Sequence, residues 1–339
     1  MKITVNTDGK AETYENEAND TLLRAALRAG LPFPYECNSG GCGSCKFELV
    51  EGEVSELWSE PPGLTARDLR KGKRLACQCR PLENVVLKVH LDDYTPPAIR
   101  PARFDATYLG RRDLTPEMAE FRFQSDLPAD FLPGQYAMLT LPGVSGDRAY
   151  SMSNIPNQAG YWQFIIKRMP GGAGSVYLFD QLQVGDVLSM DGPYGQAYLR
   201  PEVERDIVCI AGGSGLSPIM SIARSVTGEP QFANRKILMF YGGRGPSDIC
   251  TPELLSEIDP LDTQLICHNV TSDPELSAKE NWQGECCFVH ELVEKTLGDR
   301  MPDYEFYFCG PPAMTEAVQR MLMIDHKVPF SQIHFDRFF

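Results

Sequence analysis

The chain has 339 residues, 42% of them hydrophobic and 23% charged, which is the composition of a folded globular protein with two or three domains. The formal net charge of −14 argues against nucleic acid and anionic membrane surfaces as partners, because both attract basic proteins. No uninterrupted apolar run is long enough to predict a membrane span. The eleven cysteines, in a chain without an N-terminal signal segment, indicate reduced thiols and metal ligands, and so a cytoplasmic protein.

A glycine-rich cysteine loop dominates the first unit, residues 1–95, where the patterns predict a small α+β fold of short strands and one helix. Four thiols follow the C-x4-C-x2-C spacing of a plant-type [2Fe–2S] centre, with the last cysteine arriving from a distant segment. These predicted ligands are Cys37, Cys42, Cys45 and Cys77. Thiolates suit iron, and Gly40, Gly41 and Gly43 can adopt the positive φ angles that a tight loop needs. Their backbone N–H groups could then point at the cluster sulfurs.

Two alternatives are open at this loop. Zinc also binds four thiolates, although zinc sites more often use two C-x2-C pairs. Cys77 and Cys79 lie two residues apart on an extended segment, so their side chains point to opposite sides and only one can face the cluster. We predict Cys77 as the ligand and Cys79 as a buried spare thiol.

A proline-rich linker, 96–102, precedes a second unit of short strands, 103–202. Several short strands separated by turn residues are typical of a small antiparallel β-barrel. The predicted strands are 103–109, 118–124, 135–141, 148–153, 162–168 and 186–190.

Two features of this second unit fit a dinucleotide. Alternation along one strand places Arg148 and Tyr150 on the same side, where a guanidinium can bind a diphosphate and a tyrosine can pack on a flat ring system. A glycine-rich stretch with Gly174 and Ser175 precedes a predicted helix, 176–181, and free N–H groups at a helix start form a phosphate site. An ordinary strand with an exposed arginine would explain the first feature alone. Together the two predict a dinucleotide-sized ligand.

The third unit, 203–339, alternates strands and helices, which predicts a parallel, doubly wound α/β sheet. One glycine turn follows the strand 206–211 and opens a helix predicted from Pro218, and a second turn follows the strand 305–308. Because the carboxyl ends of such strands line the ligand crevice, both turns should meet there. The first turn contains Gly212, Gly213, Gly215 and Pro218, and the second contains Cys309, Gly310 and Pro311.

Over its whole length the chain resembles the NADH-dependent reductase components of bacterial multicomponent oxygenases. The first unit resembles plant-type ferredoxins. The remainder is similar to the ferredoxin-reductase superfamily in its Arg-x-Tyr-Ser, Gly-Gly-x-Gly-x-x-Pro and Cys-Gly-Pro-Pro patterns. The segments 36–45 and 75–79 and the Asp-Arg-Phe-Phe ending look most like toluene-monooxygenase electron-transfer components. The resemblance implies a [2Fe–2S] cluster, FAD and NADH as cofactors.

The resemblance also implies roles for residues of the barrel unit. Arg148 would bind the FAD diphosphate together with Gly174 and Ser175. Tyr150 would pack on the flavin, and Ser151 would lie near flavin N5.

In the α/β unit, Cys309 would lie beside the nicotinamide. The chain end could be a frayed tail, but the resemblance implies that Phe339 covers the flavin ring and yields to nicotinamide. The other residues expected to shape the nucleotide pocket are Gly212, Gly213, Gly215, Pro218, Gly310 and Pro311.

The implied activity is electron transfer. NADH would reduce FAD, and single electrons would pass through the cluster to an oxygenase-system protein, either a Rieske ferredoxin or a diiron hydroxylase of a hydrocarbon monooxygenase. The same build could serve a ring-hydroxylating dioxygenase or a deoxysugar-forming dehydrase, and a zinc-stabilised interaction protein is the alternative from another class. We predict a monomer that prefers NADH to NADPH, since only Arg235 and Arg244 offer positive charge near the second strand of the α/β unit.

A basic stretch lies shortly before Cys77. It could be a solvated face or a docking surface for an acidic partner. Its residues are Arg67, Arg70, Lys71, Lys73 and Arg74.

Overall fold

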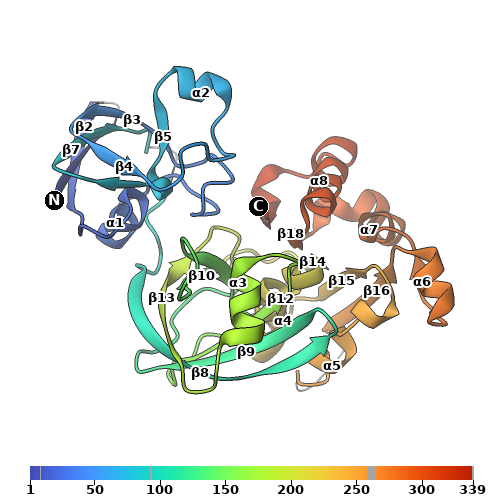
Figure 1. Ribbon diagram of the computed structural model, residues 1–339. Helices are drawn as coiled ribbons and strands as arrows, with labels where there is room; N and C mark the ends of the chain where they lie inside the picture. The colour runs from blue at the N-terminus through green and yellow to red at the C-terminus, as the bar shows by residue number, and fades with distance from the viewer. Residues whose placement is uncertain (8, 92–93, 259–263, 338–339) are drawn as a thin grey trace.

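The structure is a computed structural model that describes residues 1–7, 9–91, 94–258 and 264–337, arranged as three units in chain order (Figure 1). In the first unit a five-stranded sheet of order β2-β1-β7-β3-β5 packs against one main helix, and a small second sheet pairs β4 with β6. Its elements are β1 (Lys2–Thr7), β2 (Lys10–Glu15), α1 (Leu22–Ala29), β3 (Lys46–Glu51), β4 (Val54–Glu56), α2 (Ala66–Arg70), β5 (Lys73–Leu75), β6 (Cys79–Pro81) and β7 (Val85–Lys88).

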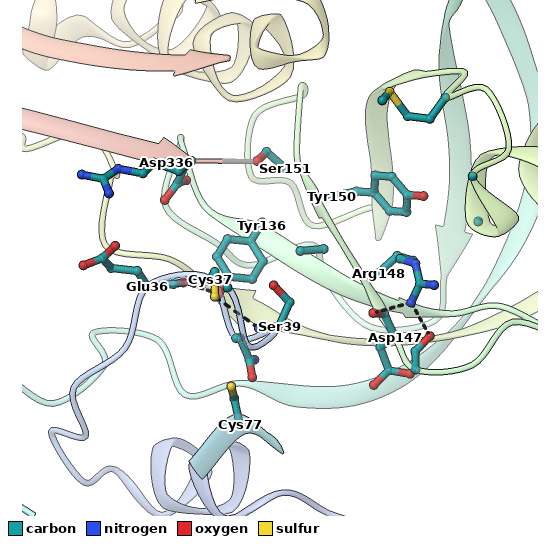
Figure 2. Close-up of a pocket in the computed structure, with 18 of the residues that line it drawn as sticks. Glu36, Cys37, Ser39, Cys77, Tyr136, Asp147, Arg148, Tyr150, Ser151 and Asp336 are labelled. Atoms are coloured by element: carbon teal, nitrogen blue, oxygen red, sulfur yellow. Dashed lines mark hydrogen bonds between the residues drawn. The ribbon is translucent and has the colours of Figure 1, made fainter. Parts of the chain in front are cut away.

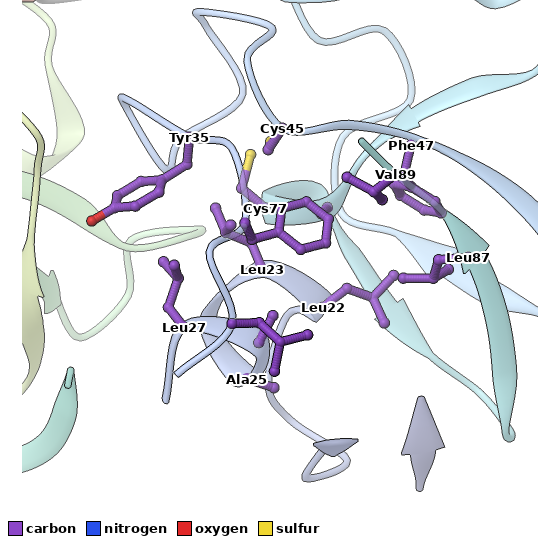
Figure 3. Packing of buried hydrophobic residues seen from close by; sticks show 14 of the residues in the cluster. Leu22, Leu23, Ala25, Leu27, Tyr35, Cys45, Phe47, Cys77, Leu87 and Val89 are labelled. Atoms are coloured by element: carbon purple, nitrogen blue, oxygen red, sulfur yellow. The ribbon is translucent and has the colours of Figure 1, made fainter. Parts of the chain in front are cut away.

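The core of the first unit lies between α1 and the sheet (Figure 3). Leu22 and Leu27 of α1 pack there with Phe47 of β3 and Leu87 of β7, all at most 2% exposed. Gly30 ends the helix in the left-handed region, with φ of 85°. Because the cysteine loop is attached to this packed core, its thiols are held in place by rigid neighbours.

The second unit is the predicted antiparallel barrel. Its sheet has the order β11-β10-β13-β8-β9-β12, and a bridge between Met152 and Phe164 joins the two outer strands, which closes the sheet. Its elements are β8 (Ala102–Thr115), β9 (Met118–Ser125), β10 (Tyr136–Thr140), β11 (Arg148–Ser151), β12 (Tyr161–Lys167), α3 (Ala173–Val176) and β13 (Val187–Tyr194).

The prediction of a helix that starts at residue 176 was wrong. The helix α3 begins at Ala173, so Gly174 and Ser175 lie inside it rather than before it, and a π-helical turn, Tyr177–Gln181, follows. The Ser175 side chain folds back on the carbonyl oxygen of Gly172, which closes the first helical turn over the glycines.

The third unit is the predicted doubly wound parallel sheet, with the order β17-β16-β15-β14-β18-β19. The strand order reverses between β14 and β18, so the crevice of this sheet lies at their carboxyl ends. Its elements are β14 (Ile207–Gly212), α4 (Leu216–Gly228), β15 (Ile237–Gly243), α5 (Thr251–Leu255), β16 (Leu265–Thr271), α6 (Pro274–Lys279), β17 (Glu285–Cys286), α7 (Val289–Leu297), β18 (Glu305–Gly310), α8 (Pro312–Arg320) and β19 (Ile333–Arg337).

Two details of this unit differ from the sequence predictions. The helix α4 begins at Leu216, ahead of Pro218, because a 3₁₀ turn, Gly213–Gly215, leads directly into it. A further strand that was not predicted, β19, pairs in parallel with β18, so the frayed-tail alternative does not hold as far as Arg337. The strand β19 therefore reaches the carboxyl edge of the sheet beside β18. Among the described residues no helix is both long and apolar enough to cross a membrane.

Buried ion pairs join the first unit to the barrel. Arg24 pairs with Asp147, and Arg28 pairs with both Asp20 and Asp191, its Nη1 atom lying 2.6 Å from Asp191 Oδ1. The side chains of Asp20 and Asp191 are only 3% and 8% exposed. These directional contacts set the orientation of the first unit on the barrel.

Candidate functional site

A cavity of about 1030 Å³ lies where the three units meet (Figure 2). Its size suits a large organic cofactor. Every unit contributes to its wall, which includes Glu36–Ser39 and Cys77 of the first unit, Tyr136, Arg148–Ser151 and Gly172–Ser175 of the barrel, and Ser214, Ser217 and Asp336 of the α/β unit.

The four predicted ligand cysteines form two pairs. The Sγ atoms of Cys37 and Cys42 lie 3.2 Å apart, and the Cys45 thiol lies within hydrogen-bonding reach of Cys77 (Figure 3). Within the described residues, no three His, Cys, Asp or Glu side chains converge on one point in the manner of a mononuclear metal site. Two thiolate pairs instead suit a binuclear cluster, in which each iron takes two cysteines, better than they suit one zinc ion.

Backbone N–H groups point at the first of these pairs. The Ser39 and Cys42 N–H groups lie 3.5 and 3.3 Å from Cys37 Sγ, and the Ser44 N–H group lies 3.4 Å from Cys42 Sγ. Contact with the Cys42 thiol and these N–H donors lower the pKa of Cys37, against the opposing effect of burial, so its thiolate is favoured. These donors belong to Ser39, Cys42 and Ser44, and the expectation that the N–H groups of Gly40, Gly41 and Gly43 point at cluster sulfurs stays a prediction.

Glycine is required at position 43, where the cysteine loop contacts the backbone of Gly63. Gly43 has φ of +78°, and a Cβ atom there would lie 2.4 Å from the carbonyl oxygen of Gly63. The Gly63 N–H group in turn donates to the Gly40 carbonyl at 3.0 Å. The cysteine loop is therefore packed directly against the backbone of Gly63, which follows it in the chain.

The two candidates for the fourth ligand lie in different places, but not for the predicted reason, because Cys77 belongs to a 3₁₀ turn, Ala76–Gln78, and not to an extended segment. Cys77 lies beside Cys45 and reaches the cavity wall, whereas Cys79 contributes to a small neighbouring pocket. Burial raises the pKa of Cys79 to about 12, which keeps it a neutral thiol.

The barrel side of the cavity holds the predicted FAD residues. Arg148 Nη1 donates to the carbonyl oxygens of Ser145 and Gly146, each at 3.0 Å, so the guanidinium lies over a turn at the cavity wall (Figure 2). A Cβ atom at Gly174 would lie 3.2 Å from Arg148 Cγ and 3.3 Å from the Tyr150 hydroxyl. The glycine thus leaves room for both side chains beside the cavity.

The Ser175 hydroxyl is occupied by its own turn. It accepts from the Met169 N–H at 3.0 Å and lies 3.0 Å from the carbonyl oxygens of Met169 and Gly172. Ser175 therefore shapes the glycine turn and presents backbone, more than its hydroxyl, to the cavity.

The two glycine turns of the α/β unit meet, as predicted. A Cβ atom at Gly215 would lie 2.0 Å from the Cys309 carbonyl oxygen, and one at Gly310 would lie 3.1 Å from the Gly212 carbonyl oxygen. Pro218 is buried in the first turn of α4. Cys309 is only 2% exposed, and burial, followed by the nearby charge of Asp336, raises the pKa of its thiol.

Asp336 of β19 brings the chain end into the site. It pairs with Cys309 in the strand register and lines the cavity (Figure 2). Burial, and then the charges of Glu36 and Cys37, raise its pKa to about 7, and its Oδ2 atom has no hydrogen-bond partner among the described residues. The predicted role of Phe339 lies outside the described residues.

Two residues of the site were missed by the sequence analysis. The Tyr136 hydroxyl donates to the Glu36 carbonyl at 2.6 Å, and its backbone pairs with that of Ser151, so one side chain joins the barrel to the cysteine loop. Ser217 Oγ donates to the Ser151 carbonyl at 2.6 Å and accepts from the Ile165 N–H at 2.9 Å. Ser217 lies within the Gly-Gly-x-Gly-x-x-Pro pattern, in the first turn of α4, so that motif could have pointed to it, whereas Tyr136 belongs to no motif.

Comparison with protein families agrees with this three-part site. Residues 5–82 match the 2Fe-2S iron-sulfur cluster binding domain. Residues 107–198 match the oxidoreductase FAD-binding domain, and residues 209–320 match the oxidoreductase NAD-binding domain.

Individual proteins match over nearly the whole chain. The ferredoxin–NAD(P)(+) reductase CarAd of Metapseudomonas resinovorans is 43% identical over 94% of both chains. The ferredoxin–NAD(+) reductase component of the alkene monooxygenase system of Xanthobacter autotrophicus is 37% identical over 98% of both. The xylene/toluene monooxygenase electron transfer component XylA of Pseudomonas putida is 34% identical over 94% of this chain and 89% of its own length. A solved ferredoxin reductase in carbazole 1,9a-dioxygenase superposes with a TM-score of 0.89 at 37% identity, covering 100% of this chain and 99% of the other.

Proposed function

Because this chain belongs to the family of ferredoxin–NAD(P) reductase components of oxygenase systems, we propose that its three-walled cavity is the point where electrons from NADH are divided for a protein acceptor. The protein is a flavin iron–sulfur oxidoreductase whose cofactors are a [2Fe–2S] cluster, FAD and NAD. It takes a hydride from NADH and delivers single electrons to an oxygenase component. The observation that carries the proposal is that one cavity is lined both by the cysteine loop and by the Arg148–Ser151 strand.

We propose that the two thiolate pairs, Cys37 with Cys42 and Cys45 with Cys77, hold the cluster. When bound, the flavin converts two-electron reduction by NADH into one-electron steps, and the cluster relays those electrons to the partner. The N–H groups aimed at Cys37 stabilise negative charge on sulfur.

For FAD, we propose that Arg148 and the backbone of the turn at Gly174 and Ser175 bind the diphosphate, because they border the cavity together. Tyr150 offers a ring at the same wall, and Ser151 lies further along the strand, next to Tyr136 in the register. The Ser217 hydroxyl holds the Ser151 carbonyl and so sets the position of the Ser151 side chain.

For the nicotinamide nucleotide, we propose the crevice where the two glycine turns meet. Ser214, between them, reaches the cavity wall, and Cys309 lies directly behind Gly215. The remaining residues proposed to shape this pocket are Gly212, Gly213, Pro218, Gly310 and Pro311. The role of Phe339 as a cover for the flavin stays a proposal from the resemblance alone.

The oxygenase partner follows from the family, but its type is finer than the family name. We propose a Rieske ferredoxin or a diiron hydroxylase of a hydrocarbon monooxygenase, with the reductase acting as a cytoplasmic monomer. An aromatic-ring dioxygenase is also compatible with the relatives, one of which is the anthranilate 1,2-dioxygenase electron transfer component. We further propose unit boundaries at 95, 102 and 202. The first falls between β7 and β8 and the third between β13 and β14, whereas the second lies one residue inside β8, which begins at Ala102.

The decisive experiment compares Cys42→Ser with the matched variant Cys79→Ser. Loss of Cys42 should abolish electron delivery to a one-electron protein acceptor, while NADH-to-ferricyanide turnover, which can draw on the flavin, largely persists. Cys79→Ser should retain both activities and the iron content, because its thiol lies apart from the other four.

Loss of both activities with FAD still bound to Cys42→Ser would contradict the flavin-first order. Loss of the cluster in Cys79→Ser alone would contradict the ligand assignment. Purified protein that holds zinc and no iron would exclude the whole proposal.

A further inference from the structure

The outer face of the cysteine loop carries an exposed apolar and basic surface. Leu57 and Trp58 are 48% and 46% exposed, although large apolar side chains are usually buried. The nearby helix α2, at the top of the first unit in Figure 1, exposes Arg67 and Arg70, and Lys71 follows as its C-terminal cap. These five residues are called the α2 surface below.

The positive charges of the α2 surface are not used to stabilise the fold. In the part of the chain that the structure describes, no ion pair or hydrogen bond involves the side chains of Arg67, Arg70 or Lys71. Two of their charged neighbours are paired, since Asp68 binds Lys46 at 2.9 Å and Arg74 binds Glu56 at 2.9 Å. Arg67, Arg70 and Lys71 therefore place three unpaired positive charges close together on a chain whose net charge is −14, and the fold does not require them there.

The α2 surface is attached to the cysteine loop itself. Trp58 packs against Gly40, where a Cβ atom would lie 3.3 Å from the indole ring. The backbone N–H of Leu57 donates to the Gln78 carbonyl at 2.8 Å, and Gln78 Nε2 lies 3.7 Å from Cys77 Sγ. A protein bound on Trp58 is therefore separated from Cys77, a proposed cluster ligand, by little more than the Gln78 side chain.

The charge of the whole molecule restricts what can bind there. An acidic protein is repelled by most of this chain's surface, so the unpaired cations of the α2 surface would both attract it and orient it. The exposed indole would form the apolar centre of such a contact, with the cations as its rim.

We propose that the α2 surface is the docking site for the acceptor protein, and that this acceptor presents an acidic face around its own redox centre. The inference rests on the proposed function, because it assigns the exit of that electron path. The acceptor would take the electron on the Trp58 and Gln78 side of the loop.

The test uses two one-electron probes that carry the same haem and opposite charge: cytochrome c, which is basic, and succinylated cytochrome c, which is acidic. The holoenzyme is compared with the triple variant Arg67→Gln, Arg70→Gln, Lys71→Gln. The matched control replaces three exposed lysines by Gln on the three strands furthest from β5 in the sheet. These control lysines are Lys2, Lys10 and Lys88.

At low ionic strength, kcat/KM for succinylated cytochrome c should fall about tenfold in the α2 triple variant and less than about twofold in the control. The difference should shrink as salt is added, because exposed charges are screened. Trp58→Ala should slow the same reaction at high salt, where the cations no longer contribute. The rate with basic cytochrome c should not fall in the α2 triple variant.

Anaerobic mixing with NADH separates this inference from the proposed function. Absorbance bleaching of flavin and cluster should be the same in both triple variants and in the parent, which tests the electron path without any partner. If the cluster is not reduced by NADH in the parent, the proposed function fails. If it is reduced but the two triple variants behave alike with succinylated cytochrome c, the docking site is wrong. Binding of the parent to phosphatidylglycerol vesicles that the α2 triple variant loses would assign the surface to a membrane and equally overturn the inference.

Discussion

Replacing Gly215 by Ala should break the contact between the two glycine turns of the α/β unit. The new Cβ atom would lie 2.0 Å from the carbonyl oxygen of Cys309 and 2.3 Å from its carbonyl carbon. Ordinary contact needs about 3.5 Å, so the turns after β14 and β18 must separate by more than about 1 Å. Both atoms belong to backbone in a parallel sheet and cannot rotate away, so the cost should reach about 3 kcal/mol, the upper part of the usual range for overpacking.

The same displacement should impair reaction with NADH, because a shift of about 1 Å in a positioning element can cost about 100-fold in rate. We expect kcat/KM for flavin reduction by NADH, measured by stopped-flow absorbance, to fall by that factor while the flavin remains bound. Urea unfolding should show the loss of stability. The control is Gly228→Ala at the end of α4, where no atom lies within 4 Å of the added Cβ and the change should alter stability by no more than about 1 kcal/mol. A Gly215→Ala protein with unfolding free energy and NADH reactivity close to those of the parent would refute the packing of the two turns.

Three other changes have defined outcomes. Tyr136→Phe removes a 2.6 Å hydrogen bond to the cysteine loop, so stopped-flow should show slower cluster reduction than in the parent, with unchanged flavin reduction by NADH. If both steps run at the parent's rates, the bridging role of Tyr136 is contradicted. We expect a higher kcat/KM for NADH than for NADPH, because the Arg235 guanidinium donates to backbone carbonyls and Arg244 pairs with acidic side chains, so their positive charges are already used within the protein. Similar kcat/KM values for the two nucleotides would contradict this. Burial raises the pKa of Asp147, but the positive charge of Arg24 and the hydrogen bond from Arg24 lower it more, so the pKa is lowered overall. The stabilisation by this pair is therefore complete above the unfolded carboxyl pKa of about 3.9, and it is lost as the pH falls through the lower pKa of the folded state. Acid titration followed by tryptophan fluorescence should show this loss in the parent and not in Asp147→Asn.

Much of this molecule could be predicted because its cofactor motifs are local in sequence. The spacing of Cys37, Cys42 and Cys45 lies within one loop, and each glycine turn joins one strand to the next helix, so a short window of residues determines the geometry. Cys77 is distant in sequence, and its choice over Cys79 assumed an extended segment, whereas Ala76–Gln78 form a 3₁₀ turn in which Cys77 reaches the cavity wall. The three fold classes followed from periodicity for the same reason, and the barrel and the doubly wound sheet are confirmed.

The predictions that failed depended on side chains that compete for backbone partners. The Ser175 hydroxyl closes its own turn and draws the glycines into α3, which composition alone does not show. The strand β19 was not predicted, because it depends on pairing with the edge of β18, a backbone contact between segments with no shared motif. In both cases the deciding hydrogen bonds are made by the folded unit, after the local patterns have been satisfied.

The relative placement of the units was the least predictable feature, and it is also the feature on which electron transfer depends. Arg24 and Arg28 lie on one face of α1, and nothing near them in sequence indicates Asp147 or Asp191 as partners. An apolar contact of the same area would hold the units together but would let them slide. Buried ion pairs penalise every register in which a charge is left alone, so they contribute orientation more than stability. The Tyr136 hydrogen bond acts at the same junction, between the barrel and the carbonyl that precedes Cys37. We therefore interpret the charged junction as the element that keeps the cysteine loop and the Arg148–Ser151 strand on opposite walls of one cavity, a distance that neither unit could set by itself.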